Sequence, residues 1–185
     1  MQGVLREGLL EGRRVVLVGP ARPEFAKTLT SLGAETRELR PDLADDDANA
    51  AAAKALGPVA ALLVDGAALF AAAAPAAEEL APLRAAANTA WAAARAVANA
   101  AWIEPGRPGK IVLVAPPPDA GPHAEATIAA YENLARTTSI EWSRYGITPT
   151  AITPAATPVE DVATVVAYLV SPAGDYFSGA RLDLT

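Results

Sequence analysis

The feature that most constrains this chain is a regular alternation of short apolar runs with longer, helix-like windows. Residues 14–18, 59–64 and 110–114 are rich in valine, leucine and isoleucine. Such runs are typical of parallel strands buried on both faces. The intervening windows are long enough for the crossover helices that parallel strands require. The alternation therefore predicts an α/β fold, a three-layer, doubly wound parallel sheet with about six strands.

Local signals divide the chain into elements of a single expected domain, 1–185, with 1–12 as an N-terminal extension. Strands are expected over 14–18, 35–39, 59–64, 110–114, 148–152 and 181–184. Helices are expected over 24–32, from Asp45–Asp47 to Gly57, over 78–102 and 125–145, and from a capping box at Thr157–Glu160 to 170. Residues 71–77 are expected to form a loop or a frayed helix start.

The composition argues against several classes of function. A net charge of −6 argues against nucleic acid as a partner, because nucleic acid needs a basic surface. The absence of cysteine leaves neither a disulfide framework nor a thiol site. Polar and charged residues interrupt the alanine-rich tracts, so we expect no membrane span. Since no signal-peptide pattern opens the chain, we expect a soluble, cytoplasmic protein.

Several motifs, in the right order, resemble the short-chain dehydrogenase/reductase family. They are the Arg14–Gly19 strand and turn, Asp42-Leu43, the Leu62–Ala67 turn with Asp65 and Gly66, Asn88, Gly109–Val114, Glu141–Ile147, Ile152–Pro154 and Ser171–Asp183. The resemblance implies that Asp42 and Leu43 stand where the family contacts adenine. It also implies that Asn88 stands at the asparagine that holds a proton-relay water.

The catalytic positions of that family hold other residues here. Counting back from Gly146, the family tyrosine falls at Ala124 and its lysine at Ile128, while the serine falls near Ala115 or Pro116. None of these side chains transfers a proton. Compared with the family, one βα unit and the substrate-covering loop are also missing. Removing that unit from the family's usual strand order, 3-2-1-4-5-6-7, predicts a Rossmann-like sheet with the order 2-1-3-4-5-6.

The phosphate turn is altered as well. A dinucleotide turn needs glycines whose N–H groups face the pyrophosphate, but this chain has Pro23 and Phe25 at two of those positions and an acidic Glu24 between them. Arg22 could compensate for that charge, although a solvated surface arginine is the simpler interpretation. We therefore expect no cofactor; Gly19, Arg22, Asp42, Leu43, Asp65 and Gly66 are remnants of an NAD(P) site.

Other side chains offer few replacements for the missing groups. Tyr131 lies two helical turns from Ala124, which indicates a packing residue with a hydrated hydroxyl. His123 is a candidate base at a helix start, although a solvated loop histidine is the simpler interpretation. Asp45–Asp47 lack calcium-loop spacing, which favours helix capping, and we expect no metal.

The alanine faces of 85–101 and 126–135, with Trp91, Trp102 and Trp142 nearby, are expected to form a subunit interface. The resemblance implies that these two helices pair with a second copy or with an intact paralogue. We therefore expect a non-catalytic protein acting as a structural or regulatory subunit. The alternatives are an NAD(P)-dependent oxidoreductase with a relocated or weakened site and a small-molecule binding module.

Overall fold

The computed structural model describes residues 5–20 and 22–185, and it contains one six-stranded parallel sheet. The strand order is β2-β1-β3-β4-β5-β6, as predicted. The strands are β1 (Arg14–Val18), β2 (Glu35–Glu38), β3 (Ala61–Asp65), β4 (Gly109–Val114), β5 (Ile147–Thr153) and β6 (Ala180–Asp183). Every residue of β3 and β4 is buried, as expected for central strands covered on both faces.

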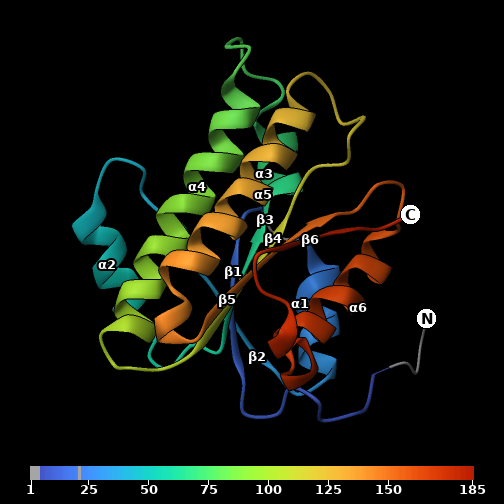
Figure 1. The fold of residues 1–185 in the computed structure, drawn as a ribbon. Coiled ribbons are helices and arrows are strands. Elements are labelled where there is room, and N and C mark those ends of the chain that lie inside the picture. The colour runs from blue at the N-terminus through green and yellow to red at the C-terminus, as the bar shows by residue number, and fades with distance from the viewer. Residues whose placement is uncertain (1–4, 21) are drawn as a thin grey trace.

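Helices cover both faces of the sheet and complete the three layers (Figure 1). One layer contains α1 (Pro23–Ser31) and α6 (Val159–Val170). The other contains α2 (Asp46–Ala55), α3 (Gly66–Ala73), α4 (Ala81–Val97) and α5 (Ala124–Glu141). In Figure 1, α4 and α5 lie side by side on the outer surface of that layer. The expected α/β fold class is thereby confirmed.

Alternating strand residues supply two cores, one on each face of the sheet. On β1, Val16 packs under α2, α4 and α5, whereas Val15 packs under α1 and α6. Leu10, in the segment predicted as an N-terminal extension, is fully buried in the α1/α6 core. The described part of that extension therefore contributes to the core. No helix of the described residues is long and apolar enough to cross a membrane.

The helical segments differ from the prediction in two places. Helix α3 occupies part of a region expected to be a turn and loop, and Asp65 caps its N-terminus. The long helix expected over 78–102 begins at Ala81, and a π-helix at Ala98–Ile103 follows it. The π-helix carries the buried Trp102, whose indole N–H donates to the Val59 carbonyl at 2.8 Å.

The helix starts show one expected cap and one that is absent. The Asp45 carboxylate accepts the Ala48 N–H at 2.9 Å, as the run of aspartates predicts. The capping box at Thr157 was predicted wrongly: α6 begins at Val159 with Pro158 as its N-cap, and no side chain caps it. Thr157 lies one residue before that N-cap, and its hydroxyl has no hydrogen-bond partner.

Candidate functional site

The first candidate site is the crevice at the carboxyl ends of β1 and β3, where ligands bind in sheets of this kind because the strand order reverses there. Gly19 closes the turn after β1 with φ +119°, and a Cβ atom on it would lie 3.0 Å from the Asp65 carbonyl oxygen. Only glycine allows this approach between the two turns. The remaining cavity is about 70 Å³, compared with roughly 300–1,000 Å³ for small-molecule sites.

An internal ion pair closes this crevice. The Nε atom of Arg22 bonds to one carboxylate oxygen of Asp65, and a terminal guanidinium nitrogen bonds to the other at 2.5 Å. The Asp65 side chain is 7% exposed and that of Arg22 is 31% exposed. The same carboxylate accepts the Ala68 N–H at 3.0 Å. The structure thus brings together Arg22 and Asp65, two of the residues predicted to be remnants of an NAD(P) site. Their opposite charges are paired with each other.

The turn between β1 and α1 contains Pro20 and Pro23, and neither residue has a backbone N–H group. Helix α1 begins at Pro23, which has no N–H. Phe25 is buried in the α1/α6 core, and the guanidinium carbon of Arg22 lies 4.9 Å from the centre of its ring. That distance is within cation–π range, so the ring holds Arg22 in place over the turn. Residue 21 of this turn lies outside the described residues.

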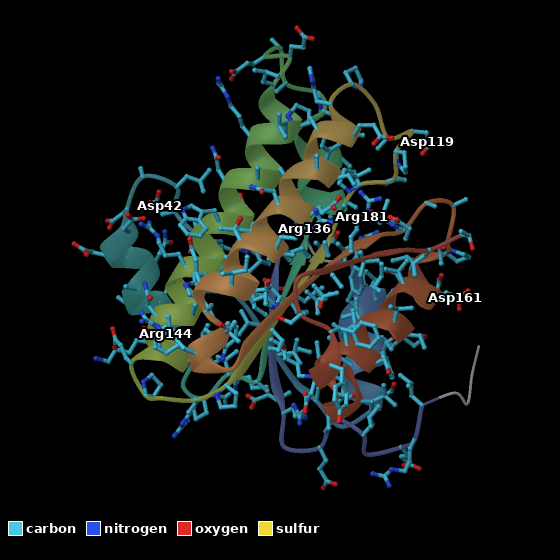
Figure 2. All side chains as sticks on the ribbon, viewed as in Figure 1. Asp42, Asp119, Arg136, Arg144, Asp161 and Arg181 are labelled. Atoms are coloured by element: carbon cyan, nitrogen blue, oxygen red, sulfur yellow. The ribbon has the colours of Figure 1, made fainter. Side chains whose placement is uncertain are left out.

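The acidic side chain at the crevice rim is Glu38, the last residue of β2, and not Asp42. Asp42 lies in the loop before α2, where its carboxylate accepts the Ala44 N–H at 2.9 Å; Figure 2 shows it at the margin beside α2. Leu43, next to it, is 56% exposed. Rossmann sheets place an acidic residue about 20 positions after the turn glycine, and that spacing identifies Glu38.

The second candidate site, around the end of β4 and the start of α5, is apolar. Ala115 and Ala124 are each 1% exposed and Ile128 is 4% exposed, while Pro116 is buried beside them. The side chains of Ala115, Ala124 and Ile128 are all packed against other protein atoms. Asn88, the remaining family position, is exposed on α4. The structure therefore does not bring these positions together as a proton-transfer set.

His123 is the N-cap of α5 and has a left-handed backbone with φ 68°. Its Nε2 atom lies 3.2 Å from a carboxylate oxygen of Glu79, in the segment before α4. The Thr127 hydroxyl bonds to the carbonyl of the histidine, so this residue ties the start of α5 to the neighbouring loop. The histidine ring therefore has a carboxylate partner, and the residue directly precedes Ala124 in the sequence.

Tyr131 is a core residue, and the hydrated hydroxyl expected for it is wrong. The side chain is 1% exposed and its hydroxyl donates to the Ala86 carbonyl at 3.1 Å. The ring lies against Gly66, where an added Cβ would come within 2.1 Å of the phenolic oxygen. Burial, and secondarily the negative charge of Asp65, raise the pKa of Tyr131. A phenol held neutral in this way packs the sheet against α4 and α5.

A buried cation near the amino end of the central strand β4 has a structural role that was not predicted from the sequence. Lys110 donates to the carbonyl oxygens of Leu169 (3.1 Å) and Ser171 (2.6 Å) and pairs with Asp175 at 2.5 Å. Burial lowers the pKa of Lys110. These three partners use all the donors of an ammonium group, so Lys110 holds the carboxyl end of α6.

The outward face of α4 and α5 is uncharged over most of its length. We call the following residues the α4/α5 face: Ala87, Asn88 and Trp91 of α4, and Ala126, Ala130, Asn133, Thr137 and Ile140 of α5. Trp91 stacks on Trp142 with ring centres 6.3 Å apart. A groove of about 320 Å³ runs between the helices beside Trp91 and ends at Glu141. Trp91 is 43% exposed and Ile140 77% exposed.

Charged side chains pair at the ends and along one side of this face. Arg84 and Arg95 stand at the two ends of the α4 stripe that contains Asn88 and Trp91, and they pair with Glu78 and Asp46. On the α5 side, Arg136 and Arg181 both bind Glu132, and Figure 2 shows the two arginines next to each other at α5 and β6. The strip between these pairs is therefore a candidate protein-binding surface.

One expectation about the alanines of α4 requires correction. Ala94 was expected on the subunit interface, but it is 1% exposed in the core between the sheet and the helices. Ala86, Ala90 and Ala93 are fully buried as well. Most of the alanine tract therefore serves close helix packing within the chain, and the exposed surface is narrower than predicted. Trp102 likewise belongs to the core.

Solved structures identify the fold. A citronellol catabolism dehydrogenase from Pseudomonas aeruginosa superimposes with a TM-score of 0.74 at 20% identity, over 98% of this chain and 96% of that one. A short-chain dehydrogenase/reductase from Serratia marcescens gives 0.72 at 18% identity, over 95% and 97%. The fold is that of the short-chain dehydrogenase/reductases. A hydroxysteroid dehydrogenase from Escherichia coli gives 0.73 at 18% identity, over 96% and 97%.

The sequence comparisons found nothing comparable: no family model matches the chain, and no curated protein does. At these identities the solved structures establish the fold alone. Among the described residues, no group of three or more histidine, cysteine, aspartate or glutamate side chains is placed to hold a metal ion.

Proposed function

We propose that this chain is a non-catalytic protein with a short-chain dehydrogenase/reductase fold, acting as a structural or regulatory subunit of an oligomer. The observation that carries the proposal is the burial of apolar Ala115, Ala124 and Ile128 where the fold family would hold its serine, tyrosine and lysine. General acid catalysis needs a titratable group within hydrogen-bond reach of the substrate. These positions supply none.

The closed crevice supports the absence of a cofactor. A bound NAD(P) would have to displace the Arg22–Asp65 pair and enter a cavity of about 70 Å³. Calorimetric titration with NADH and NADPH tests this directly. We expect no saturation at millimolar concentration, and a dissociation constant near 1 μM, about −8 kcal/mol, would contradict the proposal.

The alternative is an NAD(P)-dependent oxidoreductase with a relocated site. His123 favours it, since this residue stands at the start of α5 with Glu79 as a carboxylate partner. Turnover of carbonyl substrates with NADPH, lost in a His123→Ala variant and retained in an Asn88→Ala variant, would establish this alternative. We expect no turnover from the wild-type protein.

The proposed partner surface is the α4/α5 face, occupied by a second copy of the chain or by an intact short-chain dehydrogenase/reductase. An isologous contact needs a self-complementary patch. The α4/α5 face offers both a protruding Ile140 and a groove beside Trp91. Burying an isoleucine side chain contributes roughly 1.5–3 kcal/mol, and a two-fold interface would count this residue twice.

The test compares an Ile140→Glu variant with a Tyr176→Glu control, since Tyr176 is 95% exposed and lies outside the α4/α5 face. We expect light scattering at micromolar concentration to give an oligomer for the wild type and the control and a monomer for Ile140→Glu. A monomeric wild-type protein would contradict the proposal that a second copy of the chain binds the α4/α5 face. Failure to co-purify with a co-expressed intact reductase would then remove the heteromeric version.

A further inference from the structure

A separate pocket lies at the amino ends of β1, β4 and β5, so it is at the opposite end of the sheet from the crevice between β1 and β3. Its volume is about 440 Å³, which is within the range of small-molecule sites. The walls combine small residues, such as Gly109 and Gly146, with the charged side chains of Arg13, Lys110 and Asp175. The small residues leave the space open, and the charged side chains border it.

Two cations share this pocket. The Nζ atom of Lys110 donates to the carbonyl oxygens of Leu169 and Ser171, and the Arg13 guanidinium donates to that of Val170 at 3.3 Å. Because these three acceptors belong to consecutive residues, the cations stand side by side at the carboxyl end of α6. Burial lowers the pKa of Lys110, and the positive charge of Arg13 lowers it further. The two like charges therefore repel each other.

The protein balances this positive charge only in part. Asp175, on the short helix Pro172–Tyr176, faces Lys110, but its side chain is 62% exposed. Among the described residues, Arg13 has no carboxylate within 4 Å and uses one of the five N–H donors of a guanidinium. The hydroxyl of Thr148 also lines the pocket and has no hydrogen-bond partner in the described part of the chain. The pocket thus combines excess positive charge with unused donors, in a chain of net charge −6.

The rim of the pocket adds further positive charge. The Gly109 N–H donates to the Gly146 carbonyl at 3.4 Å, so the loops before β4 and β5 meet there. These loops carry the exposed Arg107 and Arg144, and neither has a carboxylate within 4 Å among residues 5–20 and 22–185. Figure 2 shows Arg144 near the lower end of α5. Unpaired cations around a concave site raise the local concentration of anions.

We propose that this pocket binds a small polycarboxylate, with one carboxylate on Arg13 and Thr148 and a second replacing Asp175 at Lys110. A guanidinium pairs with a carboxylate through two parallel hydrogen bonds, and the group that Lys110 holds is already a carboxylate. Two adjacent cations in a pocket larger than a single inorganic anion favour a ligand with two acid groups. The inference goes beyond the proposed function and does not depend on the oligomeric state.

Asp175 sets the affinity of the pocket. Its carboxylate reaches Lys110 from the surface and is mostly exposed, so it can turn into solvent when a ligand enters. A free ligand has to compete with this tethered carboxylate, which lowers the apparent affinity. We therefore expect the wild-type protein to bind with a dissociation constant of about 0.1–1 mM.

The experiment is a titration with citrate, followed by amide chemical shifts, with sodium chloride of equal ionic strength as the blank. We expect saturating shifts centred on Gly109, Gly146 and Thr148. Asp175→Asn removes the competing charge and should bind citrate at least about fivefold more tightly. Arg13→Gln keeps an N–H donor for the Val170 carbonyl but loses the charge, and should bind at least about tenfold more weakly. Circular dichroism verifies that both variants are folded.

Arg40→Gln is the matched control, because Arg40 is an exposed arginine outside this pocket, and it should bind citrate as the wild type does. Shifts centred elsewhere, unchanged affinity in folded Arg13→Gln, or no gain in Asp175→Asn would each overturn the inference. Inorganic phosphate provides the test of ligand class: binding as tight as that of citrate would show an adventitious ion only. The β4/α5 site and the oligomeric state do not enter these readouts, so failure here is separable from failure of the proposed function.

Discussion

The Arg22–Asp65 pair should respond asymmetrically to removal of either partner. Arg22→Met would leave a carboxylate that is 7% exposed with one remaining hydrogen bond, from Ala68. Removing one partner of a buried pair costs about 3–5 kcal/mol. Asp65→Asn would leave a guanidinium that is 31% exposed and able to reach water, at a cost of about 1–2 kcal/mol. The arginine substitution should therefore be the more damaging by roughly 2 kcal/mol.

Urea unfolding followed by circular dichroism measures both losses, and equal m-values would show that the unfolding transitions are comparable. The double variant should be no less stable than Arg22→Met alone, because it removes the stranded charge. Arg40→Met is the matched control: its pair with Glu38 is exposed, with Arg40 88% accessible, and should change stability by less than about 1 kcal/mol. A larger loss from Asp65→Asn than from Arg22→Met would refute the reasoning.

Three further predictions concern a strained backbone position, the buried Lys110 and the buried Tyr131. Ala155 has a left-handed backbone with φ 47°, a conformation that is strained for any residue with a Cβ atom. Ala155→Gly should therefore raise the free energy of unfolding by about 0.5–1 kcal/mol, as measured in urea. A lower free energy of unfolding would show that the backbone is not strained there. Lys110→Met removes the donors at the end of α6 and should cost about 2–4 kcal/mol, with thermal melting as the readout and an unchanged melting temperature as the contrary result. The raised pKa of Tyr131 means that the folded state keeps a proton that the unfolded state loses near pH 10. Stability should thus fall as pH rises above 10, and Tyr131→Phe should weaken that fall; ultraviolet absorbance showing the phenolate in folded protein would contradict this.

The valine- and leucine-rich runs and their crossovers made a parallel sheet predictable. The order of its strands was predicted from the resemblance to the short-chain dehydrogenase/reductases, with one βα unit removed. Helix α3 was not predicted: its residues are almost all alanine or larger apolar groups, so no polar face marks the helical period. The buried face of α4 could not be predicted either, because alanine occurs on both sides of the helix: Ala94 lies in the core and Ala87 lines the groove. The π-helix after α4 leaves no sequence signal that we recognise.

The side-chain contacts of the candidate site could not be predicted from the sequence. Counting from Gly146 places Ala124 and Ile128 at the positions that the family resemblance assigns to the tyrosine and the lysine. The pairing of Arg22 with Asp65 joins residues 43 positions apart, and it depends on the β1–β3 neighbourhood and on a rotamer. Glu38 was missed because the family resemblance directed attention to Asp42, although its spacing from Gly19 is the signal that could have found it.

The burial of Ala124 limits how a tyrosine and a lysine could be introduced at the start of α5 by substitution. A tyrosine at that position would meet closely packed neighbours, and a lysine in place of Ile128 would put an ammonium group among apolar side chains. Either substitution would require the start of α5 to move away from the core. The contact between His123 and Glu79 ties that helix start to the adjoining loop and opposes this movement. A designer or a lineage seeking the activity would need to rebuild that helix start before any catalytic group there became useful.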